Sequence, residues 1–225
     1  IWRCRFSVLG QVLTDVAGRN GLQAIVAADK ASIEVEHLDQ DRESDSAFLA
    51  RLGRLHDAVA TVKARRLLFA AVGSGETPGG TFIPPASLTR SDGDRHDWEA
   101  AARDSYSGVI AIWQDRSAAT RKEVLVGSAD NPKRLGRIYG SERTARRAAE
   151  STFKRQSRAG ARFNLNLARG RPDLFPEQKL SLSGWKPQID AANWLIVETR
   201  HSLTSTGGLT TTLNLELGGS GSSSG

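Results

Sequence analysis

The residues of this sequence that are best suited to catalysis are its histidines and one cluster of acids. The histidines are His37, His56, His96 and His201. No two of them lie four residues apart on one predicted helix, the spacing that places two zinc ligands on one face. The acids fall in residues 92–99, a polar stretch without the apolar pocket by which a glycosidase keeps one carboxyl group protonated. We expect this stretch to be a solvated loop.

Signals of nucleophilic and phosphate chemistry are incomplete. Gly73-Ser74-Gly75 follows a predicted strand, but the helical pattern that completes a nucleophile elbow does not follow it. The same segment lacks the Gly-Lys-Ser/Thr ending of a phosphate-binding loop. The single cysteine, Cys4, excludes an internal disulfide and a multi-cysteine metal site, and it fits a reducing compartment. We therefore predict no catalytic residue, no metal ligand and no cofactor.

Two of the histidines have structural interpretations. His56 falls at the end of a predicted helix, where a positive side chain suits the helix dipole. His201 falls at the end of a predicted strand, where we expect a hydrogen bond at the rim of a sheet.

Composition is that of a globular protein. The chain has 225 residues, of which 39% are hydrophobic and 25% charged, so it can bury a sizeable core. The net charge of +6 raises the question of nucleic-acid binding. The basic residues are interleaved with acids along the chain. Because a nucleic-acid-binding surface would concentrate basic residues on one face, we do not favour this interpretation. The sequence contains no run of about 18 apolar residues, so no membrane-spanning helix is predicted. Because the sequence has no methionine, we expect it to be a fragment of a longer protein.

Residues 1–72 are predicted to form an α/β subdomain of helices and a hairpin. Apolar residues at helical spacing predict a helix over residues 7–19 with Ser7 as its N-cap, and a second helix that Ser44 caps. The β-prone runs on either side of Ala64 predict a tight hairpin over residues 58–72. The Gly-rich loop that follows predicts a boundary.

Residues 73–217 are predicted to form a β-rich domain with one helix over residues 141–157. Ser141 caps this helix, and we expect its face of Ala145, Ala149 and Phe153 to pack on the C-terminal sheet. The remaining predicted elements are strands at 106–114 and 121–127, an irregular segment at 128–140, strands of alternating polarity at 161–167 and 209–217, and two more strands at 180–183 and 193–201. Residues 218–225 contain only Gly and Ser and are predicted to be a flexible tail.

Tryptophans suggest where a partner protein could bind. Trp113 and Trp194 lie within apolar strands, which predicts that they belong to the core. Trp185 follows Gly184 in a predicted loop, where it could be partly exposed. Tryptophan is enriched at the centres of protein interfaces, so Trp185 is the better candidate for a contact residue.

Three stretches of the sequence have a characteristic order and spacing, and they are residues 37–52, 141–150 and 170–203. The third is the most specific, because it combines Arg171 near its start with the run Gly184-Trp185-Lys186-Pro187. Together the three stretches resemble the phage late control protein D family. Members of that family are tail hub proteins of contractile-tailed phages, related to the hub portion of VgrG spike proteins.

The resemblance implies an α+β fold with a barrel-like antiparallel β-sheet. It implies a fragment of a longer hub protein that lacks the N-terminal barrel. The implied role is a structural hub, a homotrimer in full-length form, that joins tail tube to spike in the virion tail after assembly in the bacterial cytoplasm. Interface contacts are then expected at Trp185, Lys186 and Arg171. A tail-associated hydrolase and a basic nucleic-acid-binding module remain the alternatives.

Overall fold

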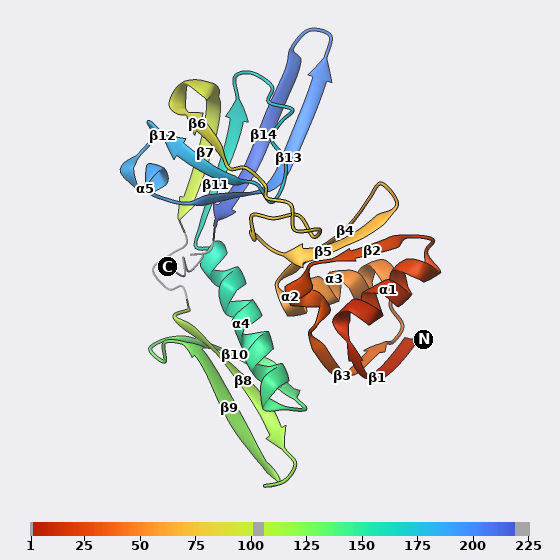
Figure 1. Ribbon diagram of the computed structural model, residues 1–225. Helices are drawn as coiled ribbons and strands as arrows, with labels where there is room; N and C mark the ends of the chain where they lie inside the picture. Colours follow the sequence, from red (N-terminus) through yellow and green to blue (C-terminus); the bar gives the residue numbers. More distant parts are fainter. Residues whose placement is uncertain (1, 101–105, 219–225) are drawn as a thin grey trace.

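The computed structural model describes residues 2–100 and 106–218, which form four sheets around three hydrophobic cores (Figure 1). The long helix α4 (Glu142–Arg158) lies between the N-terminal part and a small sheet, and its end reaches the C-terminal sheet (Figure 1). Residues 219–225 of the predicted Gly/Ser tail lie outside the described residues. The predicted domain boundary at residue 72 stays a prediction.

The N-terminal part packs two helices between two small sheets. Strands β1 and β3 pair antiparallel, β2 pairs parallel with β5, and β5 pairs antiparallel with β4. The apolar stripes of α1 and α3 meet the inner face of β5 in one core that includes Leu13, Phe48 and Phe69. The elements are β1 (Trp2–Val8), α1 (Leu9–Arg19), β2 (Gln23–Val26), α2 (Ala28–Ala31), β3 (Glu34–Gln40), α3 (Asp45–His56), β4 (Ala58–Lys63) and β5 (Arg66–Ala71).

The helix and hairpin signals of this part are confirmed, with two local differences. Ser44 caps α3 by accepting the backbone N–H of Ala47 at 3.2 Å. Ser7 does not cap α1, because it belongs to β1 and the N-cap position is taken by Val8. The hairpin turn contains both Ala64 and Arg65, which have φ of 48° and 59°. Positive φ at both central residues is what two-residue hairpin turns require to match the twist of the strands.

The C-terminal part is a six-stranded sheet in the order β6-β12-β13-β14-β11-β7. Its strands curl around a core that includes Phe163, Trp194 and Leu213, which confirms the barrel-like sheet and the core position of Trp194. The pair β12–β6 is parallel and the other pairs are antiparallel. The elements are β6 (Ala86–Thr89), the short 3-10 helix η1 (Arg90–Asp92), β7 (Gly93–Ala100), β11 (Ala161–Leu167), β12 (Lys179–Ser183), α5 (Pro187–Asp190), β13 (Trp194–Thr204) and β14 (Gly208–Leu217).

A third core lies between α4 and a three-stranded sheet of order β10-β8-β9. The strands are β8 (Gly108–Asp115), β9 (Thr120–Gly127) and β10 (Pro132–Tyr139). The irregular segment predicted at 128–140 is therefore wrong over β10, which pairs parallel with β8. Mostly exposed residues and a glycine obscured this edge strand in the sequence, because it has little apolar alternation.

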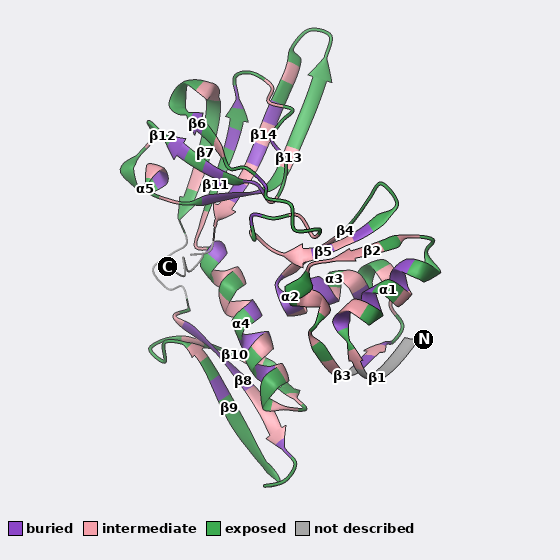
Figure 2. Ribbon diagram, in the orientation of Figure 1, coloured by how far each residue is buried: buried purple, intermediate pink, exposed green. Residues whose placement is uncertain are grey.

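The predicted helix over residues 141–157 is confirmed as α4, but its packing partner is not the predicted one. Ala145, Ala149 and Phe153 pack on β8 and β9 rather than on the C-terminal sheet. Ser141 caps the helix by accepting the N–H of Thr144 at 3.4 Å. Figure 2 shows that buried residues recur along α4, which packs against the small sheet and against the N-terminal part. The small side chains of Ala145 and Ala149 let the helix approach its strands closely.

Gly127 makes the close contact between β9 and α4 possible. Its φ is +88°, and a Cβ there would lie 2.8 Å from the Phe153 ring and 2.6 Å from the Ser107 carbonyl oxygen. We predict that Gly127→Ala lowers the free energy of unfolding by about 1–3 kcal/mol, measured by urea denaturation. Gly136→Ala in β10 is the matched control, since nothing lies within 4 Å of its Cβ position and its φ is ordinary. Equal effects of the two substitutions would contradict this account.

Candidate interface

The turn that carries Trp185 and Lys186 is fixed by a carboxylate of the next helix. Gly184 turns the chain with φ of +87°, directly after β12. Asp190 at the end of α5 accepts the backbone N–H groups of Gly184 at 2.9 Å and Trp185 at 3.0 Å. The backbone of the turn at Trp185 is thereby fixed by local hydrogen bonds.

Trp185 is half-buried at the flank of the C-terminal core. Its ring meets Phe163 edge-on at 5.9 Å between centroids, and a Cβ on Gly93 would lie 3.3 Å from it. The indole nitrogen is buried, with no hydrogen-bond partner in the described part of the chain. Lys186 is exposed and places its ammonium group 5.7 Å from the centre of the Trp98 ring. The turn thus presents one partly accessible aromatic side chain and one cation.

Arg171 lies on the loop after β11 and is held by its own neighbours. Its guanidinium donates two hydrogen bonds to Asp173, at 2.8 and 2.7 Å. These bonds raise the pKa of Arg171. Its backbone N–H donates to Thr211 Oγ1 at 2.9 Å, which ties the loop to β14. Its charge is largely satisfied within the chain, so a partner would meet Arg171 and Asp173 as a pair.

The acids predicted to lie in a solvated loop belong instead to η1 and the edge strand β7. Asp92 accepts the backbone N–H of Thr89 at 2.8 Å, and this bond together with the Thr89 hydroxyl lowers the pKa of Asp92. His96 packs on Phe163, with ring centroids 5.5 Å apart. Asp97 and Glu99 are exposed. Asp97 and Glu99 are two residues apart and share one face of β7, and Asp94 is exposed as well, so the carboxylates of this strand are solvated.

His56 differs from its predicted role as a charged helix terminus. Its side chain is buried, and burial, followed by repulsion from Arg147 and Lys30, lowers its pKa to about 4. The ring is therefore neutral near pH 7. The prediction was wrong because the free energy needed to bury a charged imidazole is larger than its stabilisation by the helix dipole. His201 lies within β13 and shares a hydrogen bond of 2.9 Å with Thr211, while His37 lies in β3.

We predict that His56 makes the protein less stable in acid. The pKa of His56 in the folded chain, about 4, lies below the ordinary 6.5. Its contribution to the free energy of unfolding is therefore fully present above pH 6.5 and is lost as the pH falls toward 4. At about 1.4 kcal/mol per pKa unit, the free energy of unfolding falls by about 3 kcal/mol over this range. Urea denaturation at pH 7 and pH 4 should show a smaller loss for His56→Gln than for the unchanged chain. His96→Gln is the control, and an unchanged pH dependence in His56→Gln would contradict the assignment.

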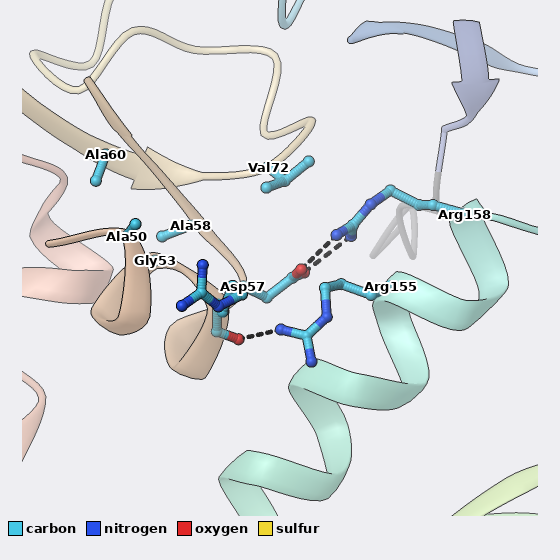
Figure 3. Close-up of a pocket in the computed structure, with 9 residues that line it drawn as sticks. Ala50, Gly53, Asp57, Ala58, Ala60, Val72, Arg155 and Arg158 are labelled. Atoms are coloured by element: carbon cyan, nitrogen blue, oxygen red, sulfur yellow. Dashed lines mark hydrogen bonds and ion pairs between the residues drawn. The ribbon is translucent and has the colours of Figure 1, made fainter. Parts of the chain in front are cut away.

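A buried ion pair joins the N-terminal part to α4, and no local sequence pattern predicted it. Asp57, in the left-handed conformation after α3, accepts two hydrogen bonds from Arg158, one of them 2.9 Å long. Figure 3 shows Arg158 and Arg155 reaching from α4 toward the end of α3. Arg155 donates to the backbone oxygen of Arg54, and Ser151 donates to the same oxygen at 2.6 Å. Helix α4 is thus clamped to the C-terminal end of α3.

A second contact joins the loop after β5 to the C-terminal sheet. The backbone N–H of Gly73 donates to the Glu177 carboxylate at 2.7 Å. Burial raises the pKa of Glu177, despite the opposing effects of that hydrogen bond and of the Arg158 charge. The N-terminal part, α4 and the C-terminal sheet therefore meet at one polar junction.

Comparison with known proteins identifies the family. A sequence model of the phage tail baseplate hub (GPD) family matches residues 7–207. The chain belongs to this family. The probable baseplate hub proteins of Escherichia phages 186 and P2 are 35% and 34% identical to it, each over 94% of this chain. The chain covers 64% and 65% of their respective lengths, which is less than two thirds.

The fold of the chain agrees with that of a solved tail protein. The 43 kDa tail protein of prophage MuSo2 from Shewanella oneidensis superposes with a TM-score of 0.67 at 14% identity, over 95% of this chain and 66% of that one. The late control protein D resemblance and the mixed α+β class are thereby confirmed, and the family places the chain in the phage tail. Within the described residues, no helix is long and apolar enough to cross a membrane, and no three His, Cys, Asp or Glu residues are grouped to hold a metal.

Proposed function

We propose that this chain is a structural subunit of the hub in a contractile phage tail, and that it joins the tail tube to the spike through protein contacts. The observation that carries the proposal is the match to the baseplate hub family over residues 7–207. The braced junction at Asp57 supports it, because a subunit that transmits force needs its parts held in a fixed arrangement. Trp185, Lys186 and Arg171 are proposed contact residues for a tail partner.

The full-length hub is proposed to be a homotrimer. This chain covers less than two thirds of its relatives, so part of the ring contacts can lie outside it. We expect light scattering to find a stable trimer for the full-length hub at micromolar concentrations and weak association for the present chain. A monomeric full-length hub throughout that range would contradict the proposal.

We propose that the chain does not catalyse a reaction. Asp94 and His96 are exposed on the edge strand β7, and the other histidines lie on β3, α3 and β13. A hydrolase needs its acid, base and nucleophile within reach of one bound substrate, in a site that excludes water. We expect no turnover of peptidoglycan, peptide or nucleotide substrates above buffer. An activity abolished by a single substitution at Asp92, Asp94, His96, His56 or His201, in a variant that remains folded, would establish the hydrolase alternative instead.

A further inference from the structure

The junction between α3 and α4 contains two small hollows, one on each side of Asp57, and both are rich in cations. Each has a volume of about 150 Å³. Their linings contain six lysines and arginines but two acids, a surplus of four positive charges in a chain whose net charge is +6. The cations are Lys30, Arg54, Arg147, Lys154, Arg155 and Arg158, and the acids are Asp57 and Glu150. The lining of the two hollows is therefore predominantly cationic.

The hollow on the side of Arg54 and Arg155 has the less compensated charge. Asp57 is its one acid, and the bidentate pair with Arg158 already engages both of its carboxylate oxygens. In the other hollow, Asp29 lies 3.5 Å from Lys30, and Glu150 contributes a second carboxylate. We therefore assign the ligand site to the first hollow, which Figure 3 shows.

Arg155 is a partly buried cation whose hydrogen bonds go to neutral groups. It donates to the backbone oxygen of Arg54, to Ser151 Oγ at 3.4 Å and to Thr152 Oγ1 at 3.3 Å. Burial, with the nearby charges of Arg158 and Arg54, lowers its pKa, although Asp57 partly opposes this. A partly buried guanidinium is costly without an anionic partner. An anion entering the hollow would supply that partner.

The rest of the lining selects the kind of anion. Ala50, Ala58, Ala60 and Val72 form apolar walls beside the guanidinium groups. Such walls suit the aliphatic stem of an acidic side chain, while the planar arginines suit its carboxylate. Inorganic phosphate has no stem to bury there. The lining residues of the described chain include no aromatic ring on which a nucleic-acid base could stack.

We propose that this hollow binds a glutamate or aspartate side chain of an acidic segment in a partner protein, with Arg54 and Arg155 holding the carboxylate. Arg54 is an exposed residue of the lining, and Arg155 reaches in from α4 (Figure 3). The ligand then touches the N-terminal part and α4 together, so its binding strengthens their contact.

The test is fluorescence anisotropy of a labelled hexaglutamate peptide with the 225-residue chain at 150 mM salt. We expect saturable binding that Arg54→Gln and Arg155→Gln each weaken about tenfold, as the loss of a charge-assisted hydrogen bond implies. Arg121→Gln at an exposed position of β9 removes the same charge elsewhere and should change binding less than twofold. Arg54→Gln keeps the test decisive if Arg155→Gln is unstable, since the Arg54 side chain is exposed and its backbone oxygen remains.

Three results would overturn the proposal. The first is absence of binding, and the second is equal weakening by all three substitutions, which would indicate general charge attraction. The third is that inorganic phosphate or a labelled single-stranded oligonucleotide binds this hollow as tightly as hexaglutamate does, with the same sensitivity to Arg54→Gln. A hexaglutamine peptide serves as the neutral comparison and should not bind.

Discussion

Replacing Arg158 with Ala is expected to lower the free energy of unfolding by about 3–5 kcal/mol. The side chains of Arg158 and Asp57 are only 8% and 10% exposed, so the substitution leaves a buried carboxylate without its cation. Desolvation of the unpaired charge, more than the lost attraction, causes the effect. Because the pair joins α4 to the end of α3, we also expect the N-terminal part and α4 to unfold in separate transitions in this variant.

Urea denaturation and calorimetry of this variant measure both effects. Arg146→Ala on the same helix is the matched control, since Arg146 pairs with Glu142 on the surface at 2.9 Å and its loss should cost at most about 1 kcal/mol. Asp57→Asn combined with Arg158→Gln should cost less than the two single changes together, because neither charge is then left alone. A loss below about 1 kcal/mol in Arg158→Ala would show that the junction is not a structural brace.

Phe163→Ala is expected to cost about 3–5 kcal/mol through loss of the central ring of the C-terminal core. Phe163 is fully buried, and its ring lies 5.6 Å from that of Trp194 and 5.9 Å from that of Trp185. Removing it leaves a cavity that strands β11 and β14 cannot close without breaking their register. The Trp185 turn should also lose its fixed position.

Phe175→Ala separates this effect from a general loss of aromatic surface. Phe175 is 43% exposed on the loop before β12, so its replacement should change stability by about 0.5 kcal/mol or less. Chemical denaturation followed by tryptophan fluorescence measures both variants. Similar losses for Phe163→Ala and Phe175→Ala would mean that the core is not centred on Phe163.

The sequence predicted those elements that have a capping residue, regularly spaced apolar residues and a residue that ends the element. Helix α3 begins at the cap of Ser44, and α4 begins at the cap of Ser141, as expected. Alternation over residues 161–167 and 209–217 predicted β11 and β14, which pair in register. In these segments, the local preference and the tertiary packing favour the same structure.

The features that the sequence did not reveal depend on contacts between distant residues. Strand β10 has little alternation, and its pairing with β8 decides its conformation. His56 falls at a helix end in the sequence, but α4 packs over that end and buries it. Asp57 and Arg158 are 101 residues apart, and neither belongs to a motif. Such pairs are found only when the path of the chain is known.

The most direct test of the hub role is the mass of the complex that the full-length protein forms with its spike. Light scattering should find a trimer alone and, after the spike is added, one complex that contains three hub copies. Charge reversal at the proposed contact, Lys186→Glu, should weaken that complex while the hub trimer persists. A hub whose mass does not change when the spike is present, at concentrations at which the virion assembles, would contradict the account.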